Sequence, residues 1–111
     1  MDILTRQENS VAIISITGEI SFKQIAALQE EIQQILQNSL NGLILDLTRT
    51  TYIDSAGLSI LMRCHAHMVR GRGKFIVVGV TGAVERVLKM MKLDTVLTLV
   101  HTLEDAKAKI A

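Results

Sequence analysis

The chain alternates between two hydrophobic patterns, one typical of strands and one typical of helices. Short apolar runs predict strands at about residues 3–7, 11–16, 43–47, 75–80 and 96–100. Between these runs, apolar residues recur at the three- and four-residue spacing of a helix with one buried face. The predicted order is therefore strand, strand, helix, strand, helix, strand, helix, strand, helix.

The first predicted helix has a well-marked start. Ser21 and Gln24 fit a capping box, in which Ser21 is the N-cap and Gln24 reaches back to it. Ile20 and Ile25 occupy the two positions of a hydrophobic staple around that cap. The apolar stripe of this helix consists of Ile25, Leu28, Ile32 and Ile35.

The other helices carry similar signals. Their apolar stripes are Leu58, Leu61, Met62, His65 and Val69 in the second helix, and Val84, Val87, Leu88 and Met91 in the third. Gly71 and Gly73 are expected to end the second helix, because glycine tolerates the left-handed conformation that ends helices. Thr102 and Asp105 resemble a capping box that opens a terminal helix running through Ile110.

Strands that alternate with helices predict an α/β fold with a mostly parallel sheet and right-handed crossovers. The first two strands add an antiparallel edge, and residues 1–111 are expected to form a single domain with about four helices. In such sheets, functional sites lie beyond the carboxyl ends of the strands. Two loops are predicted at that edge, residues 48–55 and 79–82.

Composition narrows the class of protein. Hydrophobic residues make up 49% of the chain but aromatic residues only 3%, so the core is expected to be aliphatic. A formal net charge of +1 argues against a nucleic-acid partner. Cys64 is the only cysteine, which suits a reducing cytosol. No signal peptide and no apolar run of about 18 residues is present, so a soluble, cytoplasmic protein without a membrane partner is expected.

The segment from Tyr52 to Leu58 is the most informative stretch, because it places Ser55 where a strand gives way to a helix. The first N–H groups of a helix lack internal partners, and an anion on Ser55 would meet them and the positive end of the helix dipole. Ser and Asp are also the usual N-cap residues. The local sequence therefore leaves two roles open for Ser55, a helix cap or a phosphorylation switch.

A serine hydrolase is a less favoured alternative for this corner. The nucleophile elbow requires Gly-x-Ser-x-Gly, and here Gly57 is present but Ile53 occupies the other glycine position. His65 and His67 lie roughly two or more turns along the helix that Ser55 opens, too far to act as a base. The sequence therefore predicts no catalytic residues.

Other polar groups have simpler explanations. Cys64, His65 and His67 are spread around their helix, whereas metal ligands at i and i+4 share one face, so no metal site is predicted. The segment 79–82 lacks the lysine of a P-loop, and no cofactor is expected. A basic patch near the end of the second helix fits the helix dipole, with anion or nucleic-acid binding as a secondary interpretation. It consists of Arg63, Arg70, Arg72 and Lys74.

The order of elements and the corner from Asp54 to Leu58 resemble the STAS domain of bacterial anti-sigma-factor antagonists. Gly18-Glu19-Ile20 resembles the family's start of the first helix, and Leu45-Asp46-Leu47 resembles the strand that leads into the phosphoacceptor loop. Residues 84–93 resemble the family's third helix. The resemblance covers nearly the whole chain.

The resemblance implies a role in transcription regulation. The unmodified protein would bind an anti-sigma factor that is itself a GHKL-type serine kinase, and a sigma factor would thereby be released. Phosphorylation of Ser55 would break that binding, and a PP2C-type phosphatase would restore it. The partner-binding residues implied are Gly18, Glu19, Ile20, Ser21, Asp54, Ser55, Ala56, Gly57 and Leu58.

Two positions depart from the family pattern. Ser21 stands where many members have Asp, which removes a negative charge that could affect kinase docking. Ala56 stands where many members have a second Ser or Thr, which leaves Ser55 as the only hydroxyl at the corner. Some STAS domains instead regulate transporters or other signalling partners, and the sequence leaves that alternative open.

Overall fold

The computed structural model describes all residues from Met1 to Ala111 and begins with an antiparallel hairpin. Strand β1 (Asp2–Glu8) pairs with β2 (Val11–Ile20) over its full length, from Asp2 opposite Thr17 to Glu8 opposite Val11. Asn9 turns the chain in the left-handed conformation that asparagine tolerates, with φ of 56°.

The rest of the main sheet is parallel. Strand β2 pairs with β3 (Gly42–Asp46), β3 with β5 (Lys74–Val78), and β5 with β6 (Thr98–Val100), which gives the order β1-β2-β3-β5-β6. A short 3-10 helix, η1 (Leu93–Thr95), precedes β6, so the last strand starts later than predicted. The predicted fold class, a mostly parallel sheet with an antiparallel edge, is confirmed.

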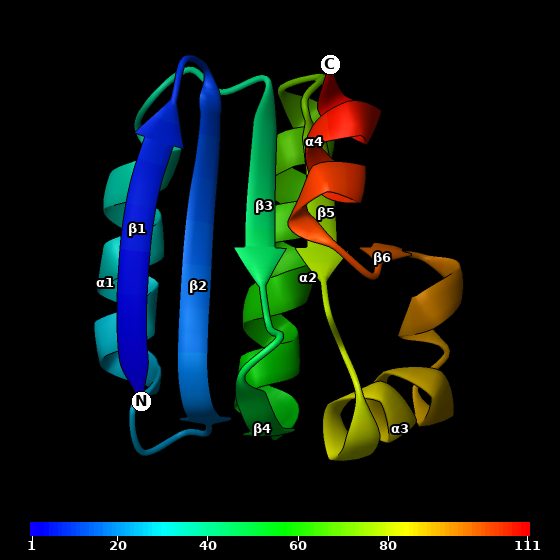
Figure 1. Ribbon diagram of the computed structural model, residues 1–111. Helices are drawn as coiled ribbons and strands as arrows, with labels where there is room; N and C mark the ends of the chain where they lie inside the picture. Colours follow the sequence, from blue (N-terminus) through cyan, green and yellow to red (C-terminus); the bar gives the residue numbers. More distant parts are fainter.

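Helices cover the two faces of the sheet unequally. Figure 1 shows α1 (Ile25–Leu36) and α2 (Ser55–Arg70) behind the sheet and α4 (Leu103–Ile110) in front of it, with α3 (Gly82–Met90) beyond the strand ends. No helix is both long and apolar enough to span a membrane.

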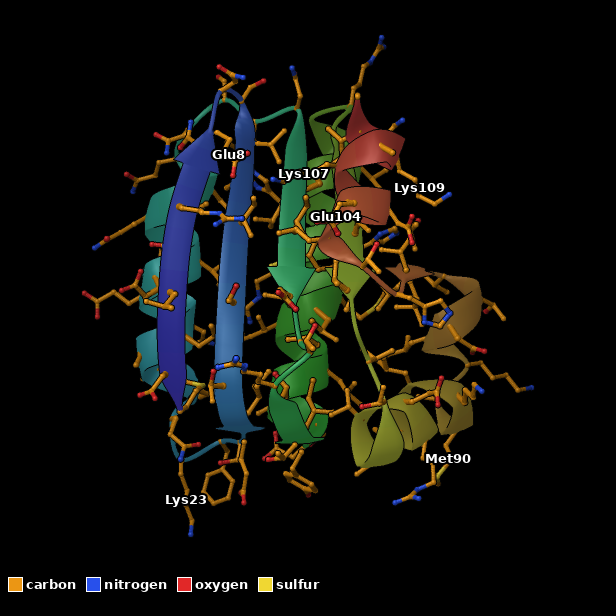
Figure 2. All side chains as sticks on the ribbon, viewed as in Figure 1. Glu8, Lys23, Met90, Glu104, Lys107 and Lys109 are labelled. Carbon is orange, nitrogen blue, oxygen red and sulfur yellow. The ribbon has the colours of Figure 1, made fainter.

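Two aliphatic clusters form the core. The larger one includes residues of α1, α2 and α3 packed on the sheet. The smaller one consists of Ile13, Ile44, Ile76, Val78 and Ala106, and it lies under α4. An ion pair of 3.2 Å between Lys107 Nζ and Glu8 Oε1 also joins α4 to the end of β1 (Figure 2). Burial on both faces explains why the central strands are continuously apolar.

A strand that the sequence analysis treated as a loop lies at the carboxyl edge of the sheet. Strand β4 (Thr50–Ile53) pairs in parallel with the second half of β2, which continues past the predicted end at residue 16. The register shifts between Gly18 and Glu19, and Gly18 takes a φ of +98° that favours glycine. Thr50 Oγ1 donates a buried hydrogen bond of 2.9 Å to the carbonyl of Ile16. A short polar segment thus becomes a strand because β2 offers it a free edge.

The predicted start of the first helix is wrong. Helix α1 begins at Ile25, its N-cap is Gln24, and no side chain caps it. Ser21 Oγ instead donates a hydrogen bond of 2.7 Å to Gln24 Oε1, and the residues between them form a turn. The two capping-box residues are therefore bonded to each other, through these side chains and through a 3.0 Å bond from the Gln24 N–H to the Ser21 carbonyl, and neither side chain caps the helix.

The other predicted helix ends have mixed outcomes. At the end of α2 the left-handed residue is Arg72, with φ of 61°, rather than Gly71 or Gly73. Gly73 is closely packed, since a Cβ there would lie 3.1 Å from the carbonyl oxygens of Leu40 and Asn41 and 2.7 Å from the Met68 methyl. The cap of α4 is confirmed, because Thr102 Oγ1 accepts a hydrogen bond of 3.1 Å from the Asp105 N–H.

Candidate functional site

The Ser55 corner, which we define as residues 52–58, joins the end of β4 to the start of α2. Asp54 is the N-cap of α2, because its backbone is extended and its Oδ1 accepts a hydrogen bond of 3.0 Å from the Gly57 N–H. Ser55 is the first helical residue, its side chain is exposed, and its hydroxyl makes no hydrogen bond within the protein. Of the two roles left open by the sequence, the helix cap therefore belongs to Asp54 and not to Ser55.

The same carboxylate also holds the loop between β2 and α1. Asp54 Oδ2 accepts a hydrogen bond of 2.9 Å from the Phe22 N–H, and the Asp54 N–H donates one of 3.1 Å to the carbonyl of Ile20. The two segments that the sequence analysis assigned to one surface, residues 18–21 and residues 54–58, are thus joined.

The hydrogen bonds to the Asp54 carboxylate favour its ionised form and so keep a negative charge at the Ser55 corner. The hydrogen bond from Gly57, and next that from Phe22, lowers the pKa of Asp54 below its usual value of 3.8, although partial burial opposes this. At neutral pH the Asp54 carboxylate is therefore ionised directly beside the Ser55 hydroxyl.

Gly57 lets the first turn of α2 pack closely on the sheet. A Cβ at this position would lie 2.6 Å from Ile53 Cγ1 and 2.9 Å from Ile20 Cγ2. Both isoleucines are only 1% exposed, so they have little room to move. The absence of a side chain at Gly57 therefore determines how near Ser55 lies to the end of β2.

The nine expected partner-binding residues differ in exposure. Ser55 and Glu19 are exposed, and Gly18, Asp54 and Ala56 are partly exposed. The others are buried, with exposed fractions of 1% for Ile20 and 9% for Ser21 and Leu58, and Gly57 is also buried. Ile20 and Leu58 therefore shape the surface from beneath, while the exposed groups form it.

Two exposed aromatic residues were missed by the sequence analysis. Phe22, whose N–H is bound by Asp54, is 68% exposed, and Tyr52 of β4 is 44% exposed. They are two of only three aromatic residues in the chain, and the third, Phe75, is buried. Their rarity was the signal in the sequence that could have drawn attention to them, because an aliphatic core does not need aromatic side chains to fill it.

The other candidate residues do not join this site. Neither His65 nor His67 forms a hydrogen bond with Ser55. Cys64 is buried in α2, and burial raises the pKa of its thiol to about 12, although the Arg63 charge acts in the opposite direction. No three His, Cys, Asp or Glu side chains lie together as a metal ion would require.

Comparisons with known proteins agree with this architecture. The family model of the STAS domain matches residues 2–106. The chain belongs to the STAS domain family. The anti-sigma-F factor antagonist RsfB of Mycobacterium tuberculosis is 33% identical over 104 residues, which cover 94% of this chain and 84% of RsfB.

Solved structures of STAS proteins have the same fold. An anti-sigma factor antagonist from Mycobacterium paratuberculosis superposes with a TM-score of 0.89 and 28% identity, over 98% of this chain and 92% of that chain. The phosphorylated form of SpoIIAA from Bacillus superposes with a TM-score of 0.77 and 15% identity, over 99% of this chain and 100% of that chain. The resemblance inferred from the sequence is therefore confirmed at the level of family and fold.

The close packing of Gly57 yields a stability prediction. Gly57→Ala should lower the free energy of unfolding, because overpacking costs roughly 1–3 kcal/mol and outweighs a gain in helix propensity of at most about 1 kcal/mol. Gly71→Ala is the matched control, since a Cβ there would lie 3.6 Å from the nearest atom, an ordinary contact. Urea denaturation of both variants tests this, and equal stabilities would contradict it.

The lowered pKa of Asp54 predicts how the cap depends on pH. At about pH 7, Asp54→Asn should destabilise the protein by about 1 kcal/mol, because asparagine can still cap the helix but its amide cannot accept both N–H bonds and carries no charge. The advantage of the wild type is present above the unfolded-state pKa, near 3.8, and is lost as pH falls through the lower folded-state pKa. Urea denaturation from about pH 7 to about pH 2 measures this difference, and a pH-independent difference would refute it.

Proposed function

We propose that this protein is an anti-sigma-factor antagonist switched by phosphorylation of Ser55. The unphosphorylated form binds an anti-sigma factor that is a GHKL-type serine kinase, so that a sigma factor is released, and a PP2C-type phosphatase reverses the modification. The observation that carries this proposal is the exposed, unbonded hydroxyl of Ser55 beside a cap supplied by another residue. The similarity to RsfB supports the same function.

The physical basis of the switch is local charge. A phosphoserine adds about −1.5 to −2 charges at neutral pH. At the first position of α2 this charge meets helix N–H groups and the positive end of the dipole, a favourable interaction of roughly 0.3–1 kcal/mol. The ionised Asp54 carboxylate opposes it from the adjacent position. The two effects are of similar size, so the fold survives phosphorylation.

Phosphorylation weakens partner binding more than it destabilises the fold. The exposed residues of the Ser55 corner form a contact surface with Glu19 and Phe22, and Tyr52 and Phe22 provide apolar anchors of the type enriched in interface hot spots. A phosphate placed on this surface must be desolvated when the partner docks, and an unmatched buried charge is strongly unfavourable. Modification therefore acts through the interface.

Substitution at Ser55 distinguishes an effect on partner binding from an effect on the stability of the fold. Ser55→Asp should keep the melting temperature within a few degrees of wild type, because Asp54 retains the cap. Partner affinity should fall by at least about tenfold, which corresponds to about 1.4 kcal/mol of binding free energy. Ser39→Asp, an exposed serine on the loop before β3, adds the same charge elsewhere and is the control.

The experiment begins with capture of partners from a native extract by wild type, Ser55→Ala and Ser55→Asp. A captured kinase should be retained by wild type and Ser55→Ala and lost by Ser55→Asp. With ATP, it should phosphorylate wild type at Ser55 alone, as peptide mass mapping shows. Phosphate found on Ser59 or Thr51 would contradict the assignment, and a captured transporter or other regulator would place this STAS domain outside sigma control.

The aromatic anchors give an independent test of the contact surface. Phe22→Ala and Tyr52→Ala should each weaken partner binding by roughly 1–4 kcal/mol, the range of hot-spot residues. Their stabilities should stay within about 0.5 kcal/mol of wild type, since both side chains are exposed. Met90→Ala is the control, because Met90 is 79% exposed but lies on α3 outside the corner. Calorimetric titration that ranks Met90 with the aromatic residues would refute this surface.

A further inference from the structure

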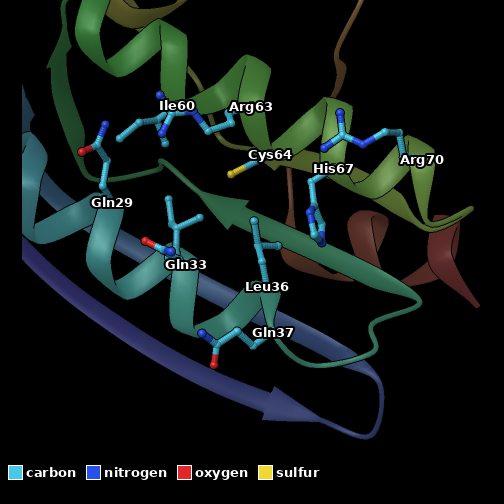
Figure 3. Close-up of a pocket in the computed structure, with 10 residues that line it drawn as sticks. Gln29, Gln33, Leu36, Gln37, Ile60, Arg63, Cys64, His67 and Arg70 are labelled. Carbon is cyan, nitrogen blue, oxygen red and sulfur yellow. The ribbon is translucent and has the colours of Figure 1, made fainter.

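A groove with a volume of about 480 Å³ runs between α1 and α2 (Figure 3). One wall is a row of glutamines on α1, and the other is a row of basic residues on α2. The walls consist of Gln29, Gln33 and Gln37, the C-cap of α1, on one side and Arg63, His67 and Arg70 on the other. The spacings of three and four residues place each row on one face of its helix.

The floor of the groove is apolar. Ile32, Ile60 and Cys64 lie there, with exposed fractions of 6%, 3% and 1%, and Leu36 lies at one side. The raised pKa of the Cys64 thiol has desolvation as its main cause, which is what a floor of low polarity produces. A bound molecule would therefore place apolar atoms against this floor.

The basic wall has no charge partner. No acidic residue lines the groove, and neither Arg63 nor Arg70 forms an ion pair. The helix dipole explains Arg70 in the last turn of α2, but Arg63 lies about two turns earlier, where the dipole has little effect. The structure also separates Lys74 from the basic patch proposed from the sequence, since its Nζ donates to the Lys109 carbonyl.

The dimensions of the groove fit a small molecule. Its volume lies within the usual range for ligand pockets, about 300–1,000 Å³. The row from Gln29 to Gln37 is about 12 Å long at the helical rise of 1.5 Å per residue. Such a space holds a short apolar body with one polar head group.

We infer that the groove between α1 and α2 binds a small amphiphilic anion. Its apolar body lies on the floor, and its carboxylate or phosphate head group accepts hydrogen bonds from Arg63 and Arg70, whose guanidinium groups suit planar or tetrahedral oxyanions. The glutamine amides satisfy further polar atoms as donors or acceptors. None of the lining residues belongs to the Ser55 corner, so this site is distinct from the proposed switch.

Octanoate is the probe for this site, and octanamide is its neutral counterpart of the same length. Titration of the wild-type protein, followed by amide-resolved NMR, should give saturable shifts in lining residues of α1 and α2. Octanamide should bind about tenfold more weakly, because it lacks the charge that the arginines bind. Octyl phosphate, as a third titration, tells a phosphate-preferring site from a carboxylate-preferring one.

Substitutions at exposed positions test the assignment without disturbing the core. Arg63→Gln and Arg70→Gln should each weaken octanoate binding about threefold to tenfold, and added salt should weaken binding to the wild type. Gln33→Glu should also weaken binding, since it places a negative charge on the opposite wall. Arg86→Gln on α3 is the control and should leave binding unchanged, because Arg86 is exposed and outside the groove.

Three results would overturn the inference. The first is that octanoate gives no saturable shifts in the groove, and the second is that octanamide binds as tightly as octanoate, both to wild type and to Arg63→Gln. A glutamate-rich peptide that shifts the same residues and binds more tightly than octanoate would reassign the groove to an acidic segment of a protein partner.

Discussion

The candidate site depends on the two hydrogen bonds that the Asp54 carboxylate accepts. One oxygen caps α2 through the Gly57 N–H, and the other holds the Phe22 N–H of a loop that is distant in sequence. Because this carboxylate satisfies the helix start, the Ser55 hydroxyl is left exposed and unbonded. A serine that capped its own helix would be engaged with the backbone, and its modification would disturb the fold. Because Asp54 caps the helix and Ser55 does not, the Ser55 hydroxyl can be modified while Asp54 maintains the structure.

The position of this corner is determined by strand β2, which pairs with two different strands along its length. Its first half pairs with β3, and after the irregularity at Gly18 its second half pairs with β4. Strand β4 delivers the chain directly into Asp54 and α2. Gly57 then brings the helix against two buried isoleucines. The corner is therefore held by two paired strands and two buried isoleucines, and such support is what a surface needs to respond to a local charge without unfolding.

Helix α2 presents two chemically different surfaces along its length. Its N-cap, Asp54, places a negative charge beside Ser55, and its second half carries the basic wall of the groove. The Asp54 carboxylate at the start and Arg70 in the last turn both agree with the helix dipole and stabilise the helix, whereas Arg63 lies too far from the helix end for the dipole to account for it. The proposed switch therefore lies at one end of this helix and the proposed ligand groove along the rest of it, with no residue in common.

The sequence by itself determined the fold class, the central strands, the cap at Thr102 and the position of Ser55 at the start of a helix. These features follow from hydrophobic period and cap chemistry, which act over a few residues. Only the tertiary structure decided that Thr50–Ile53 is a strand, that Asp54 rather than Ser55 caps α2, and that Ser21 does not cap α1. It also brought Phe22 beside the corner and placed the glutamine and arginine rows on facing walls. Each of these outcomes depends on a contact between distant segments, such as the bond between Phe22 and Asp54 across 32 positions, and no local pattern encodes such a contact.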